Sequence, residues 1–179
     1  EKTGSILQQQ FHTDRFRLYR STALVGVQLG GAIKNVIAIA SGIADGMKLG
    51  LNARAALICR GVAEMTRLGV VMGGSAETFT GMSGVGDLVL TATGTLSRNH
   101  NLGENLGQGL SLAECLPAGG AVVEGVRNAV SIHELAERHK IEMPICNAVY
   151  QVLHEGISCA QALKQLLERD RPDEEMMSF

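Results

Sequence analysis

The chain has 179 residues, and its 16 Lys and Arg against 18 Asp and Glu give a net charge of −2. That balance and an aromatic content of 3% argue against a dedicated nucleic-acid binder, which needs a basic surplus and stacking platforms. Hydrophobic residues make up 45% of the chain, which excludes a disordered protein and suits one domain with a sizeable core.

The sequence shows no sign of a membrane segment, a secretion signal or a metal site. The longest apolar run, Val36 to Ala44, is interrupted by Ser41 and Gly42 and falls short of the ~18 residues of a membrane helix. We therefore expect no membrane insertion, and a cytoplasmic location because no signal peptide is recognisable. The four cysteines form no C-x-x-C motif, which favours reduced thiols. The five histidines form no H-E-x-x-H motif, so no metal is expected.

The apolar pattern predicts an all-α domain that follows a short β segment. Alternating apolar residues from Phe16 to Leu29 predict a short strand, with a transition near Ser21 and Thr22. From Gly30 onward apolar residues recur every three or four positions, which is typical of helices. Helices are predicted at about 30–47, 52–69, after residue 75, and at 97–106, 111–117, 126–140, 144–153 and 158–167.

Two polar residues are candidates for proton transfer. Lys34 lies among small and apolar residues of a predicted helix, and a lysine so placed can exchange a proton with a carbonyl or hydroxyl oxygen. The alternative, which spacing alone favours, is a lysine that extends from the helix edge into solvent. Asp87 closes a glycine-rich loop (81–87) at the start of a helix. A carboxylate there can bind a substrate hydroxyl or the lysine, or can simply interact favourably with the helix dipole.

One further segment suggests an anion site, and another places a carboxylate just before a helix. Ser97, Arg98 and Asn99 begin a predicted helix, where a hydroxyl, a guanidinium, an amide and free backbone N–H groups suit a phosphate. An ordinary N-cap serine followed by a solvated arginine is the alternative. Val122 and Glu124 precede the next long helix, and helix-dipole compensation also explains Glu124. Together the segments suit reduction of a phosphorylated carbonyl compound, although spacing does not establish that reaction.

In their order and spacing these segments resemble bacterial NAD(P)-dependent glycerol-3-phosphate dehydrogenase. The resemblance extends from about Phe16 to Leu167. It rests on G-V-Q-L-G-G-A-I-K-N-V-I-A-I-A-S-G (26–42), G-M-S-G-V-G-D-L-V-L-T (81–91), S-R-N (97–99) and V-V-E-G-V (122–126). It implies an oxidoreductase that interconverts dihydroxyacetone phosphate and sn-glycerol 3-phosphate for glycerophospholipid synthesis. It also implies two domains, a Rossmann domain for NAD or NADP and a helical domain similar to that of 6-phosphogluconate dehydrogenase.

The resemblance also implies roles for individual residues. Lys34 matches the proton donor and acceptor at the substrate oxygen, and Asp87 matches a carboxylate that contacts substrate and lysine. Thr91 matches a polar residue near the active site. Ser97, Arg98 and Asn99 match the residues that hold the substrate, and Arg98 also matches a residue that reaches the cofactor. Val122 and Glu124 match residues that contact the cofactor.

The family's glycine-rich dinucleotide loop and its second active-site lysine do not occur in this sequence. The resemblance implies that residues 1–22 are the end of an upstream Rossmann domain, and Glu1 is then expected to be a cut point. Residues 23–170 would then form the helical substrate-binding domain, and 171–179 a mobile tail. We expect this chain alone to be inactive and its own Rossmann domain to be its partner. A homodimer and the choice of NAD or NADP stay open. The alternatives are the helical domain of another hydroxy-acid dehydrogenase, which needs no phosphate site, and a non-catalytic helical dimerisation module.

Overall fold

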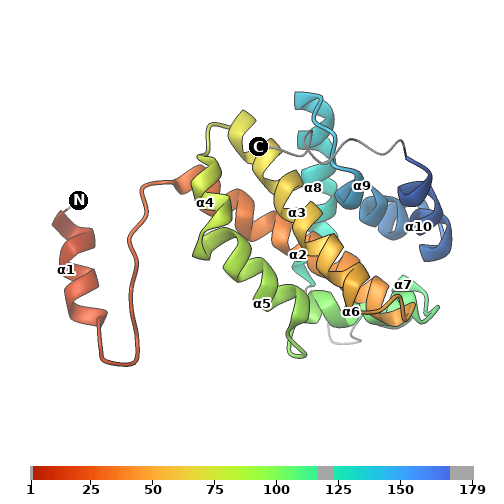
Figure 1. Ribbon diagram of the computed structural model, residues 1–179, viewed down its shortest axis with the longest axis horizontal. Coiled ribbons are helices and arrows are strands. Elements are labelled where there is room, and N and C mark those ends of the chain that lie inside the picture. Colours follow the sequence, from red (N-terminus) through yellow and green to blue (C-terminus); the bar gives the residue numbers. More distant parts are fainter. Residues whose placement is uncertain (1, 117–122, 170–179) are drawn as a thin grey trace.

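The computed structural model describes residues 2–116 and 123–169, and the regular elements of this part of the chain are helices joined by loops and by one extended stretch after α1 (Figure 1). The all-α class is confirmed, since the described ranges contain helices and π-helical turns but no strand. The elements are α1 (Lys2–Phe11), α2 (Leu24–Gly46), α3 (Leu51–Val71), α4 (Ala76–Thr80), η1 (Met82–Gly86), α5 (Asp87–Thr93), α6 (Arg98–Gly107), α7 (Leu112–Cys115), α8 (Glu124–His139), α9 (Pro144–Tyr150), η2 (Gln151–Glu155) and α10 (Cys159–Glu168).

Helix α2 is the centre of the bundle, and α3, α5, α6, α8 and α9 all contact it (Figure 1). Its 23 residues make it long and apolar enough to cross a membrane, by length and composition alone. The expectation that no segment reaches this length is therefore wrong, because Ser41 and Gly42 do not interrupt the helix. Since 61% of its most apolar window is buried inside the protein, α2 has the character of a core helix.

The β segment expected from Phe16 to Leu29 is a second correction. Thr13 and Phe16 form one isolated β-bridge, and α2 already begins at Leu24. Of the alternating residues that suggested a strand, Val25, Val27 and Leu29 lie in α2, and only Leu29 of these three is buried. Leu29 also starts the buried stripe that continues along α2, so packing of this stripe in the core outweighs a short period-two pattern.

Helices α2 and α6 approach each other through glycines. A Cβ atom at Gly42 of α2 would lie 2.0 Å from the carbonyl oxygen of His100 on α6. A Cβ atom at Gly103 of α6 would lie 2.1 Å from the carbonyl oxygen of Ile39 on α2. Because each glycine faces backbone of the other helix, the two backbones touch directly. This contact fixes the start of α6, which carries Ser97, Arg98 and Asn99, relative to α2.

The glycine-rich segment before Asp87 is helical and is not the loop that its composition suggested. Met82 to Gly86 form the π-helical turn η1, which continues directly into α5. Asp87 is the first residue of α5, as the sequence predicted. The continuous backbone gives the carboxylate a defined direction toward α2.

A buried glutamate holds the other end of the bundle. Glu64 of α3 accepts hydrogen bonds from the backbone N–H groups of Ile145 (2.7 Å) and Cys146 (3.1 Å) at the start of α9. Burial raises the pKa of Glu64 from 4.5 to about 6, while the two N–H groups act in the opposite direction. Its carboxylate therefore satisfies N–H groups that the first turn of α9 cannot satisfy itself.

Candidate active site

The structure brings Lys34 and Asp87 together, although 53 residues separate them. Lys34 Nζ of α2 lies 2.5 Å from Asp87 Oδ2 of α5, and their side chains are 22% and 37% exposed. Thr91, one turn further along α5, donates to the Asp87 carbonyl oxygen (2.7 Å) and lies 3.5 Å from Asp87 Oδ1. The ammonium is thus held by a carboxylate while both groups stay accessible to a ligand.

A buried amide network lies next to this pair. Asn35 follows Lys34 on α2 and accepts a hydrogen bond from Asn99 Nδ2 of α6 (3.0 Å). Asn35 Nδ2 donates to Gly31 O (3.1 Å) and to Glu124 Oε2 of α8 (3.3 Å). Asn99 Oδ1 accepts from the backbone N–H of Gly125 (2.9 Å). The two amides therefore tie α2 to the starts of α6 and α8.

The three residues predicted to bind an anion, Ser97, Arg98 and Asn99, do not all face the same way. Ser97 caps α6, since its Oγ accepts from the His100 backbone N–H (3.3 Å), and Asn99 points into the amide network. Arg98 is exposed and makes no hydrogen bond or ion pair with any residue of the described ranges. Arg98 is therefore the member of the triplet that a ligand can reach directly, beside the N–H groups at the start of a helix.

The cofactor residues predicted near the start of α8 are only partly described. Glu124 is exposed and is the first residue of α8, where its carboxylate lies at the positive end of the helix dipole. Val122 lies outside the described residues.

Asn35 is the site residue that sequence reasoning missed. The available signal was an amide directly after Lys34 in an otherwise apolar stretch, because a buried amide needs hydrogen-bond partners. Its partners lie 64 and 89 residues away, so the sequence did not show which groups they would be.

Comparison with known proteins places the chain in a family. Residues 23–164 match the family described as NAD-dependent glycerol-3-phosphate dehydrogenase C-terminus. The chain belongs to this family. A glycerol-3-phosphate dehydrogenase [NAD(P)+] from Cupriavidus pinatubonensis is 59% identical, over 93% of this chain and 48% of its own length. One from Geobacter sulfurreducens is 56% identical, over 93% and 50% respectively.

Solved structures of the same enzyme show the same fold. Glycerol-3-phosphate dehydrogenase from Coxiella burnetii matches with a TM-score of 0.89 and 48% identity, over 94% of this chain and 52% of that one. The enzyme from Saccharomyces cerevisiae matches with a TM-score of 0.81 and 26% identity, over 92% and 48%. The chain thus spans about half the length of the glycerol-3-phosphate dehydrogenases that it matches.

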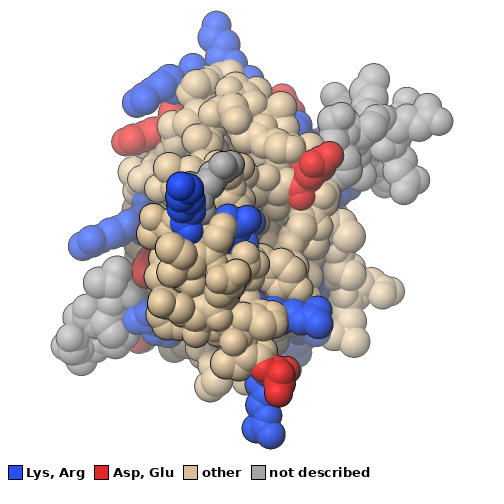
Figure 2. Space-filling model, turned by 90° about the vertical axis from the view of Figure 1, so that its left-hand side faces the viewer, with Lys and Arg blue, Asp and Glu red and all other residues tan. Residues whose placement is uncertain are grey.

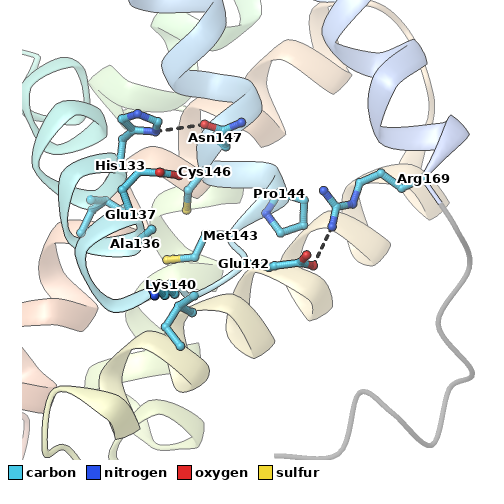
Figure 3. A pocket seen from close by; sticks show the side chains of 12 residues that line it. His133, Ala136, Glu137, Lys140, Glu142, Met143, Pro144, Cys146, Asn147 and Arg169 are labelled. Carbon is cyan, nitrogen blue, oxygen red and sulfur yellow. Dashed lines mark hydrogen bonds and ion pairs between the residues drawn. The ribbon is translucent and has the colours of Figure 1, made fainter.

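A pocket lies away from the candidate active site. It has a volume of about 340 Å³ and lies between the C-terminal half of α8 and the start of α9 (Figure 3). Four of its polar residues form two pairs, His133 Nδ1 with Asn147 Oδ1 at 3.0 Å and Arg169 with Glu142 at 2.7 Å. None of the predicted site residues lines it. Among the described residues, no group of three or more His, Cys, Asp and Glu is placed to hold a metal ion.

Proposed function

We propose that the chain is the substrate-binding and catalytic half of an NAD(P)-dependent oxidoreductase that interconverts dihydroxyacetone phosphate and sn-glycerol 3-phosphate, feeding glycerophospholipid synthesis. The observation that carries the proposal is the Lys34–Asp87 pair, which joins α2 to α5 in a chain of this family. The amide network links that pair to the helix start that presents Arg98.

Each residue has a defined part in this reaction. Lys34, as an ammonium, donates a proton to the ketone oxygen during reduction and stabilises the negative charge that develops there. Asp87 keeps the ammonium in place, and Thr91 restrains Asp87. Arg98 and the first N–H groups of α6 hold the substrate phosphate, so that binding also orients the ketone.

The residues at the starts of α6 and α8 fit contacts to a nicotinamide dinucleotide. Arg98 and Glu124 are both exposed, so a cofactor held mainly outside this chain can reach them. An arginine suits a phosphate of the cofactor, and a carboxylate suits hydroxyl or amide donors. When bound, the cofactor supplies or accepts the hydride. The choice between NAD and NADP stays open.

The N-terminal segment supports an upstream partner domain. Figure 1 shows α1 apart from the bundle at the end of an extended stretch, and α1 has no buried residue. Ile6, Phe11, Phe16 and Tyr19 are 53–64% exposed. Figure 2 views the molecule from this end, where uncharged side chains cover most of the face. Exposed apolar groups of this kind are typical of an interface. We propose that they pack on a dinucleotide-binding domain to which residues 1–22 belong.

The same proposal covers the other domain limits and the location. Residues 23–170 would be the helical domain; the predicted tail, 171–179, lies outside the described residues. All four cysteines are free, with Cys146 buried and Cys59 exposed. Free thiols suit a cytoplasmic protein. A homodimer stays a prediction.

Comparison of the full-length protein with this chain tests the proposal. The full-length protein should oxidise NADH or NADPH when dihydroxyacetone phosphate is added, followed at 340 nm. Residues 1–179 alone should show no turnover, because the chain lacks the glycine-rich dinucleotide loop. Turnover by residues 1–179 would contradict the division of roles. Full-length turnover of a non-phosphorylated hydroxy acid, but not of this substrate, would favour another dehydrogenase. Absence of any turnover would favour the dimerisation module.

Arg98→Ala in the full-length protein should mainly damage substrate binding. Loss of a charge-assisted contact to phosphate corresponds to about 1.5–3 kcal/mol, so KM for dihydroxyacetone phosphate should rise about 10- to 100-fold. The fall in kcat should be smaller, since Lys34 stays in place. Arg127→Ala, an exposed arginine on α8, is the matched control. A KM within twofold of the wild-type value would contradict a phosphate contact at Arg98.

A further inference from the structure

A polar cluster outside the site residues lies where α2, α3 and α6 meet. Asp45 Oδ2 accepts a hydrogen bond from Arg54 Nη1 of α3 at 2.8 Å and lies 3.4 Å from His100 Nε2 of α6. We call these three residues the Asp45 cluster. Neither the family resemblance nor the proposed mechanism uses any of them.

The burial of His100 defines what its ring can do. The residue is 7% exposed, and its Nδ1 atom is fully buried without a hydrogen-bond partner among the described residues. A proton on Nδ1 would be a buried donor without an acceptor, which is costly. We therefore assign the proton to Nε2, which faces Asp45. Among the described residues, the polar contact of the ring is thus the approach of Nε2 to Asp45 Oδ2 at 3.4 Å.

His100 is also part of the turn that carries the anion triplet. It follows Asn99, and its backbone N–H donates to Ser97 Oγ. Its carbonyl oxygen lies against Gly42, where a Cβ atom would approach to 2.0 Å. The Arg98 side chain makes no hydrogen bond or ion pair with the described residues, so its position depends on the backbone of this turn. Whatever fixes the His100 ring therefore fixes the backbone from which Arg98 extends.

We propose that His100 is a positioning residue that, through Asp45 and Arg54, holds the first turn of α6 in the geometry that binds the substrate phosphate. The proposal rests on the proposed function. When the site is preformed, phosphate binding carries no free-energy cost for ordering the turn, and the phosphate therefore binds more tightly. The amide network secures the same turn through Asn99, and the Asp45 cluster secures it one residue later.

A pair of amide substitutions in the full-length protein separates positioning from packing. His100→Gln keeps a donor near the place of Nε2, whereas His100→Asn places its amide near Nδ1 and does not reach Asp45. The measurements are KM for dihydroxyacetone phosphate, kcat, and the inhibition constant of inorganic phosphate. For H100N we expect KM and that inhibition constant to rise about five- to tenfold, with kcat changed less than about twofold. H100Q should stay within about twofold of the wild type for all three.

A double-mutant cycle tests whether the effect passes through Asp45. D45A should raise KM at least as much as H100N does, since it removes the contacts of Asp45 with both His100 and Arg54. D45A/H100N should be no worse than D45A, because the contact that H100N removes is already lost. E104Q is the matched control, since the Glu104 side chain lies on the same helix and makes no hydrogen bond or ion pair with the described residues. If H100N does not fold, the KM of D45A is compared with those of the wild type and E104Q instead. A raised KM in D45A alone supports the proposal, and an unchanged KM contradicts it.

The outcomes distinguish this proposal from the proposed function. A wild-type protein that does not reduce dihydroxyacetone phosphate contradicts the proposed function. Calorimetry with inorganic phosphate then still compares wild type and H100N. Equal phosphate affinity of wild type and H100N overturns the role of His100. Equal losses in H100Q and H100N, together with equally lowered melting temperatures, also overturn it, because packing alone would produce them.

Discussion

Replacing Lys34 by alanine in the full-length protein is expected to lower kcat for dihydroxyacetone phosphate reduction by about 10²- to 10⁴-fold. This range is the usual effect of losing a positioned proton donor. Alanine also removes the ammonium charge beside the developing alkoxide. KM should change less, since Arg98 and the start of α6 bind the phosphate end of the substrate.

The measurement is steady-state turnover at saturating cofactor, with melting temperature recorded for each variant. Lys164→Ala removes an exposed lysine of α10 whose ion pair among the described residues is with Glu168 at 3.7 Å, so the kcat of this variant should equal the wild-type value. Asp87→Asn should lower kcat less than K34A does, because the Lys34 ammonium remains. It should still lower kcat, because the ammonium loses its ionic partner at 2.5 Å. A K34A variant with kcat within threefold of wild type would refute the assigned role.

The helical part of the fold could be predicted because its main signal is local. Apolar residues at intervals of three and four along α2 and α8 mark the helix faces that are buried in the core, whereas α10 buries only Ala162 among its residues. Ser97, Ser111 and Ser158 were predicted to begin helices, and each caps one in the structure. The errors lie where two interpretations of the pattern compete. Val25, Val27 and Leu29 alternate as in a strand, yet Leu29 packs as part of a helical stripe.

The candidate site was only partly predictable because its contacts are not local. The chemistry of Lys34 and Asp87 could be proposed from residue type, and the family resemblance gave their roles. Residue spacing does not show that they meet across 53 residues; that contact was an expectation from the family resemblance. Asn99 was expected to hold the substrate, but its amide binds Asn35 and the backbone of Gly125. Adjacent residues of one sequence motif can therefore differ in role: one side chain is free to contact a ligand, while the next holds the backbone in place.

Gly42→Ala should be the most destabilising glycine substitution on α2 that leaves charge and polarity unchanged. Its Cβ would lie 2.0 Å from His100 O and 2.8 Å from Glu104 N, both backbone atoms of α6 that cannot rotate away. The two helices would have to separate, which weakens the contact around Gly103 as well. We expect the free energy of unfolding to fall by about 3 kcal/mol or more, at the upper end for overpacked cores.

Gly31→Ala provides a matched comparison on the same helix. A Cβ there meets nothing within 4 Å, so alanine should raise the free energy of unfolding by about 0.5–1 kcal/mol, because glycine loses more backbone freedom on folding. Urea unfolding of the full-length variants, followed by circular dichroism at 222 nm, measures both. We expect the urea concentration at the unfolding midpoint to fall for Gly42→Ala and to rise for Gly31→Ala, with the dependence of the unfolding free energy on urea unchanged. Equal midpoints for the two variants would show that α2 and α6 do not meet backbone to backbone. In that case the turn that carries Arg98 would need another support.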